Sequence, residues 1–152
     1  MRKSVPHFAA FLAAAVVSYS IVTGDAFGLK AALAASSEAV KPKLPTQTSS
    51  ASGVTINITP KDLTSNLGSW EFAIVLDTHS QDLSDDLVKS SLLLDGAGGR
   101  HSPSAWDGAP SGGHHREGVL RFKPVSPRPQ SIELQISRAG EAAPRSFRWQ
   151  LN

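Results

Sequence analysis

Two adjacent histidines, His114 and His115, stand in the segment GGHHREGVLRF and suggest a metal site. The chain has five histidines and no cysteine, so metal ligands would have to be imidazole or oxygen groups. Two other segments carry such groups: DTHS contains Asp77 and His79, and WDG contains Asp107. Imidazoles combined with carboxylates suit Zn or Cu(II). These residues form one site only if the fold brings three separate segments together.

Short segments of mostly alternating apolar and polar residues predict the strands that would position these side chains. There are seven of them: VTINIT, WEFAIVL, SSLLLD, HSPSAW, GVLRF, SIELQIS and SFRWQL. A period of two is typical of strands that bury one face. Clusters of Gly, Pro, Ser and Asp between the segments predict turns. The one helical segment expected is a single turn in DLSDDLVKSS, capped by Ser84.

The spacing of these segments leaves no room for crossover helices. We therefore predict an all-β fold: an immunoglobulin-like or fibronectin-type antiparallel β-sandwich of about seven strands. Another Greek-key sandwich, such as a cupredoxin-like barrel, is the alternative fold. A blue-copper protein itself is a poor match, because its metal site needs a cysteine.

Two longer strings, VLDTHSQDLSDDL and AWDGAPSGGHHREGVLRF, resemble a group of small exported bacterial immunoglobulin-like β-sandwich domains. The resemblance covers Val54 to Leu151. It implies the fold class, and it implies no chemistry, because no activity is assigned to the group.

In the immunoglobulin-like strand order, the second predicted strand lies beside the fifth, and the fourth also pairs with the fifth. The second strand ends at DTHS, and an antiparallel neighbour places that end beside the start of the fifth strand at HHRE. The fourth strand ends near Asp107, which we expect at the same edge. Alternation places Asp77, His79 and His115 on the outward face and gives His114 inward parity.

The predicted metal set is therefore Asp77, His79 and His115, with Asp107 or Glu117 as a fourth ligand. His114 would join it only if the glycine-led loop breaks the alternation.

Three other readings of these residues stay open. Side chains at strand ends often bond to the backbone of turns, and paired histidines at a hairpin mouth are often simply solvated. Calcium would use carboxylates alone, namely Asp77, Asp82, Asp86 and Asp107. A Ser–His–Asp hydrolase has its parts in Ser80, His79 and Asp107, but the Gly-x-Ser-x-Gly nucleophile elbow is missing.

The first 35 residues predict a signal peptide or an N-terminal membrane anchor. Arg2 and Lys3 precede an apolar run from Val5 to Val22, the pattern of a secretory signal, and the run is nearly long enough to span a membrane. Both readings place the remainder outside the cytoplasm, in the periplasm or another extracytoplasmic compartment. Residues 36–53 are rich in Ser, Thr, Pro and Lys and predict a disordered tether. Residues 54–152 are the predicted sandwich domain.

Charge and composition narrow the function. From residue 54 onward, ten Lys and Arg face eleven Asp and Glu, so the domain is near −1 and has no basic patch interleaved with aromatic residues. This gives no support for nucleic-acid binding. The predicted function is an exported, non-enzymatic envelope module that contacts another envelope protein. The alternative is an extracytoplasmic Zn- or Cu-binding module that uses His79 and His115.

Overall fold

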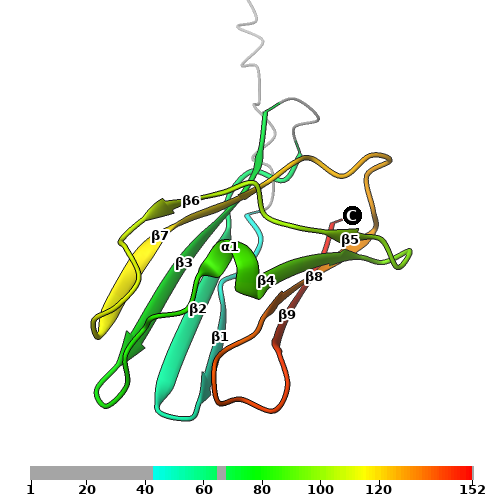
Figure 1. Ribbon diagram of the computed structural model, residues 1–152. Coiled ribbons are helices and arrows are strands. Elements are labelled where there is room, and N and C mark those ends of the chain that lie inside the picture. Colours follow the sequence, from blue (N-terminus) through cyan, green and yellow to red (C-terminus); the bar gives the residue numbers. More distant parts are fainter. Residues whose placement is uncertain (1–42, 65–67, 152) are drawn as a thin grey trace, which may run out of the picture. The chain divides into compact units, whose positions relative to one another are not determined.

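The computed structural model describes residues 43–64 and 68–151, which form two antiparallel β-sheets (Figure 1). The predicted all-β class is confirmed. The predicted leader, residues 1–35, and the first part of the predicted tether, residues 36–42, lie outside the described residues. Among the residues described, no helix is long and apolar enough to cross a membrane.

The first sheet has five strands in the order β1-β2-β3-β7-β6. Its strands are β1 (Gln47–Ala51), β2 (Val54–Pro60), β3 (Trp70–Thr78), β6 (Ala105–Gly108) and β7 (His115–Phe122). The second sheet has four strands in the order β5-β4-β8-β9. Its strands are β4 (Ser91–Asp95), β5 (Arg100–His101), β8 (Ser131–Ile136) and β9 (Arg145–Gln150).

The core lies between the two sheets and is built from the apolar positions of the alternating segments. Trp70, Phe72 and Ile74 of β3 are fully buried, as the alternation predicts. The Phe72 ring lies 5.6 Å from Phe122 on the same sheet and 5.8 Å from Trp149 on the opposite sheet, measured between ring centroids. Aromatic contact across the sandwich therefore joins the two sheets.

The described structure has nine strands rather than about seven, and one addition lies inside the predicted tether. β1 pairs with β2 along its whole length, so the folded domain starts before Val54. Hydroxyl and amide side chains bond across this pair: Thr48 Oγ1 donates to Asn57 Oδ1 at 2.7 Å, and Ser50 and Thr55 hydroxyls lie 2.8 Å apart. The tether prediction was therefore wrong for 47–51, because this strand is held by polar contacts that leave no apolar period.

The second addition comes from the segment HSPSAW, which forms two short strands instead of one. His101 ends β5 in the second sheet, and Ala105 begins β6 in the first sheet. The buried Pro103 lies between them. Proline lacks the N–H that a continuing ladder needs, so the chain changes sheets there.

The predicted helical turn is α1 (Leu87–Ser90), and its cap differs from the prediction. Asp86, not Ser84, accepts hydrogen bonds from the backbone N–H groups of Val88 and Lys89, at 3.1 and 3.3 Å. The carboxylate also lies 2.9 Å from Lys89 Nζ. An aspartate at this position satisfies two N–H groups that have no partner inside the helix.

A carboxamide and a carbonyl tie the start of the domain to β9, the edge strand of the second sheet. The Gln47 side chain donates to the backbone carbonyl of Arg148 and accepts from the Arg148 N–H at 3.1 Å. Two residues earlier, the Pro45 carbonyl accepts from Trp149 Nε1 at 2.8 Å. The β1 edge of one sheet is thus fastened to the β9 edge of the other.

The described chain enters and leaves the sandwich at the same end, which we call the tail end. It comprises residues 43–46, 61–64, 68–69, 96–99, 123–130 and 151. The opposite end, which we call the far end, comprises the loops 52–53, 79–86, 109–114 and 137–144. Figure 1 shows these four loops along the lower side of the view. The predicted metal ligands near His115 lie toward the far end.

Candidate functional site

The predicted pairing of the second and fifth segments is confirmed and brings Asp77 and His115 together. β3 and β7 are antiparallel neighbours, and Asp77 is the register partner of His115. His115 Nδ1 lies 2.6 Å from Asp77 Oδ1, and His115 Nε2 lies 3.8 Å from Glu117 Oε2. All three side chains lie on the outward face, as parity predicts. The imidazole is thus set between two carboxylates.

This arrangement favours a protonated imidazole. The hydrogen bond that His115 donates to Asp77 is the main cause that raises the pKa of His115 above its ordinary value of 6.5, and the charges of Asp77 and Glu117 act in the same direction. A metal ligand must instead offer a neutral ring with a free lone pair. The geometry therefore suits an imidazolium that donates Nδ1–H to Asp77 and lies beside a second carboxylate, Glu117, better than it suits a metal ligand.

The expectation that Asp107 shares this edge was wrong. β6 and β7 do pair as predicted, but Asp107 is the register partner of Val119, four residues further along β7 than His115. Its carboxylate lies 3.2 Å from Arg121 Nη2, and Arg121 also pairs with Glu71. The loop 109–114 separates the end of β6 from the start of β7, so the two strands do not end at the same level.

His79 and His114 lie just outside the paired strands, and both are exposed. The backbone carbonyl of His114 accepts from Thr78 N–H at 2.9 Å, which extends the ladder by one residue. The buried Thr78 hydroxyl donates to the Gly53 carbonyl at 2.8 Å and accepts from the N–H of Gln81 at 3.2 Å. The chain turns at this threonine, so His79 does not continue the outward row of β3.

The carboxylates of the calcium reading are dispersed over separate structural contacts. Asp82 accepts from Gly113 N–H at 2.8 Å, Asp86 caps α1, and Asp107 pairs with Arg121. Across 43–64 and 68–151, no group of three or more His, Asp or Glu side chains is arranged to hold a metal ion.

Beneath this surface lies a buried guanidinium, that of Arg116, which no sequence motif predicts. Arg116 is 2% exposed and occupies an inward position of β7. Its Nη1 donates to the carbonyls of Leu83 and Asp85 at 2.9 and 2.7 Å. The Trp106 ring lies 5.5 Å from the guanidinium carbon, within the range of a cation–π contact. Burial lowers the pKa of Arg116 below its ordinary value.

Parity gave a signal for Arg116 that sequence reasoning left unused. Alternation gives His114 inward parity, and Arg116, two residues later in the chain, has the same parity. The guanidinium holds the loop that leads to α1 against the sandwich, so this residue shapes the far end without being part of a reactive site.

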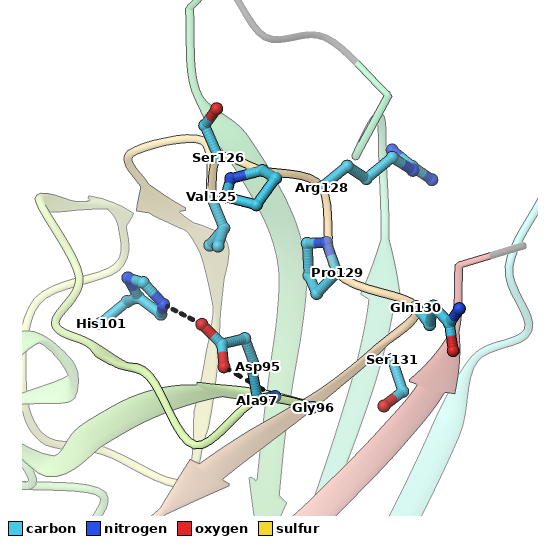
Figure 2. Close-up of a pocket in the computed structure, with 11 residues that line it drawn as sticks. Asp95, Gly96, Ala97, His101, Val125, Ser126, Arg128, Pro129, Gln130 and Ser131 are labelled. Carbon is cyan, nitrogen blue, oxygen red and sulfur yellow. Dashed lines mark hydrogen bonds and ion pairs between the residues drawn. The ribbon is translucent and has the colours of Figure 1, made fainter.

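A second feature missed from the sequence is a hollow of about 430 Å³ at the tail end (Figure 2). It lies between the β4–β5 turn and the proline-rich loop 123–130. His101 Nε2 lies 3.0 Å from Asp95 Oδ2, and Asp95 Oδ1 accepts from the N–H groups of Ala97 and Gly99 at 3.0 and 2.7 Å. Figure 2 shows His101 and Asp95 turned toward each other and Arg128 directed away from them.

The Asp95–His101 pair stabilises the turn between β4 and β5. The bond from His101 is the main cause that lowers the pKa of Asp95, and the turn N–H groups lower it further. The side chain of Asp95 is therefore fully engaged by its own turn. The segment DGAGGRH could have predicted this contact, because an aspartate before a glycine-rich turn often bonds to the turn backbone.

No protein-family model, curated protein or solved structure matches this chain.

Proposed function

We propose that this chain is an exported, non-enzymatic module of the cell envelope whose immunoglobulin-like sandwich contacts another envelope protein through its far end. The strand order supports the fold assignment. Taking β2 to β9 as strands A, B, C, C′, D, E, F and G gives sheets A-B-E-D and C′-C-F-G, with β1 as an added edge strand.

The position of the chain ends carries the proposal for the contact surface. The described chain enters the sandwich from residue 43 and leaves it at residue 151, both at the tail end, so the far-end loops are clear of the flanking chain and open to a partner. Loops at one end of a sandwich are common recognition surfaces, because the sheets hold them rigidly.

The chemistry of the far end favours a partner with a basic surface. Exposed carboxylates lie on and beside its loops, at Asp82, Asp86 and Glu117. Lys89 is the exposed lysine there, and Asp86 neutralises it, while the exposed His115 imidazole is set between Asp77 and Glu117. The three arginines of this region are buried, and two of them pair with carboxylates. Electrostatic complementarity of this kind speeds association and selects partners.

Site-specific photocrosslinking in intact cells tests the contact surface. A photoreactive residue at Ser111, in a far-end loop, should form a discrete crosslinked protein product, whereas the same residue at Ser126, in a tail-end loop, should not. The product should weaken in the Asp82→Asn, Glu117→Gln variant, which removes charge and keeps an acceptor for Gly113. Products that are equal at both positions, or indifferent to the two substitutions, would refute the far end as the contact surface.

Export is tested separately. A reporter that is active only outside the cytoplasm should be active when fused after Gly53. Activity of a cytoplasm-only reporter in that fusion would contradict export.

A further inference from the structure

We propose that the tail end is a second interaction surface, which lies on the anionic headgroups of a phospholipid membrane. The inference rests on the proposed export and takes the leader as a retained anchor. It goes further by assigning a lipid partner to residues of the sandwich itself.

Unpaired positive charge gathers at this end. Four exposed cations lie there: Lys43, Lys61, Lys123 and Arg128. Asp62 is the one exposed carboxylate among the described residues of the tail end, and residues 65–67 are Ser-Asn-Leu, without charge. None of the four cations takes part in an ion pair of the described chain.

The other lysines and arginines of the described chain are paired or buried, apart from Arg100. Five of them pair with carboxylates: Lys89, Arg121, Arg138, Arg145 and Arg148. Arg116 is buried. Arg100 is exposed, and it follows the tail-end turn 96–99 directly. Within residues 43–64 and 68–151, the exposed lysines and arginines that lack a carboxylate partner therefore all lie at the tail end or next to it.

The structure holds these charges close together. Lys61 follows β2 and Lys123 follows β7, with β3 between those strands, so their backbones lie about 10 Å apart. Arg128 donates to the carbonyl of Leu63 and to that of Leu151 at 3.1 Å, which fixes it over the end of the sandwich. Backbone carbonyls carry no net charge, so these two hydrogen bonds do not neutralise the positive charge of Arg128. Charges at such spacing act on one membrane surface together, because the spacing is close to the Debye length.

The chain brings this surface to the membrane. Residues 36–42 link the predicted leader to the first described residue and span at most about 25 Å when fully extended. An anchored leader thus keeps the tail end at high local concentration near the headgroups. The described residues of these loops carry prolines and lysines rather than large exposed apolar side chains, so the contact is electrostatic and does not insert into the acyl layer.

The test uses the full chain, which has no cysteine and accepts a single fluorescent label. Labels are placed at Ser126→Cys in the tail end or Ser111→Cys in the far end. The protein is reconstituted in phosphatidylcholine vesicles, with or without phosphatidylglycerol, that contain a headgroup-attached quencher. We expect the Ser126 label to be quenched more than the Ser111 label, only with phosphatidylglycerol, and less so at high salt.

Matched substitutions decide whether the named cations are responsible. Lys61→Gln or Lys123→Gln should each shift the docking equilibrium by about fivefold toward the undocked state. Lys89→Gln removes the same charge outside the tail end and should leave the equilibrium unchanged. Equal quenching at both labels, or equal effects of Lys89→Gln and Lys123→Gln, would overturn the proposal.

Vesicle flotation separates this proposal from the anchor. A chain that does not float with phosphatidylcholine vesicles lacks a retained anchor. In that case the soluble chain is mixed with phosphatidylglycerol vesicles, and binding that Lys123→Gln weakens still supports the surface. Absence of binding refutes it.

Discussion

His115 and Asp77 are bonded across β7 and β3, with Nδ1 2.6 Å from Oδ1, although 38 residues separate them in the chain. The bond is exposed and stronger when the ring is charged, because an imidazolium donates to an ionised carboxylate. The strength of this contact, at the start of β7 near the far end, therefore depends on pH.

The first prediction concerns this linkage. The pKa of His115 is raised in the folded state, so the stabilisation from the pair is fully present below the unfolded value of about 6.5 and is lost as pH rises through the folded value. Asp77→Asn should lower the His115 pKa, as read from imidazole NMR shifts. Glu117→Gln should lower it less, because its oxygen lies 3.8 Å away. A His115 pKa that does not change in Asp77→Asn would contradict the pairing.

The second prediction concerns the buried guanidinium. Arg116→Met should lower the free energy of unfolding by about 3 kcal/mol, because carbonyls of Leu83 and Asp85 lose their donor. Arg121→Met on the outer face of the same strand is the matched control and should cost about 1 kcal/mol or less. Urea unfolding measures both. Equal costs for the two variants would show that Arg116 has no special role.

The third prediction concerns a pair of glycines where β6 and β7 approach closely. A Cβ on Gly118 would lie 2.5 Å from the Gly108 Cα and 2.7 Å from Trp106 Cζ2. Gly118→Ala should therefore push the edge strand away and cost about 1 to 3 kcal/mol. Hydrogen exchange should accelerate in β6 while β2 keeps its protection. Unchanged hydrogen exchange in β6 would contradict the prediction, because it would mean that β6 moves to admit the methyl group without losing its hydrogen bonds.

The fourth prediction concerns the domain boundary. A chain that starts at Val54 should be less stable than one that starts at Lys43, by roughly 2 kcal/mol or more, because it loses the bonds from Pro45 and Gln47 to β9. It also removes the carbonyls of Ser49 and Ala51 that accept from Arg145. Urea midpoints that agree for the two chains would restore residue 54 as the boundary.

Apolar alternation was enough to predict most of the sheets. The buried positions of β2, β3, β8 and β9 follow directly from it, and the pairing of Asp77 with His115 followed from the expected strand order. β1 was missed because polar contacts hold it in the sheet, whereas strands are predicted from the regular alternation of apolar residues. Asp107 was misplaced because loop length sets the level at which a strand ends, and alternation carries no information on that level.

The polar character of Arg116 and Arg145 hid their structural role. Both are buried, and both bond mainly to backbone carbonyls from distant segments. Such contacts depend on how the fold positions segments that are distant in sequence, and no short sequence motif predicts that. The Asp95–His101 pair was missed for a different reason. It depends on the conformation of the local turn, which brings the two side chains together.

The fastening of Gln47 to Arg148 has a consequence for self-association. Strand edges present unpaired backbone groups that can recruit a further strand from another molecule. Here β1 covers β2, and the Gln47 carboxamide occupies the Arg148 N–H and carbonyl on β9. Proteolytic trimming after residue 51 would uncover both edges at once. We expect the trimmed chains to associate edge to edge more readily than the intact chain, because the trimmed edges offer unpaired backbone groups of β2 and β9.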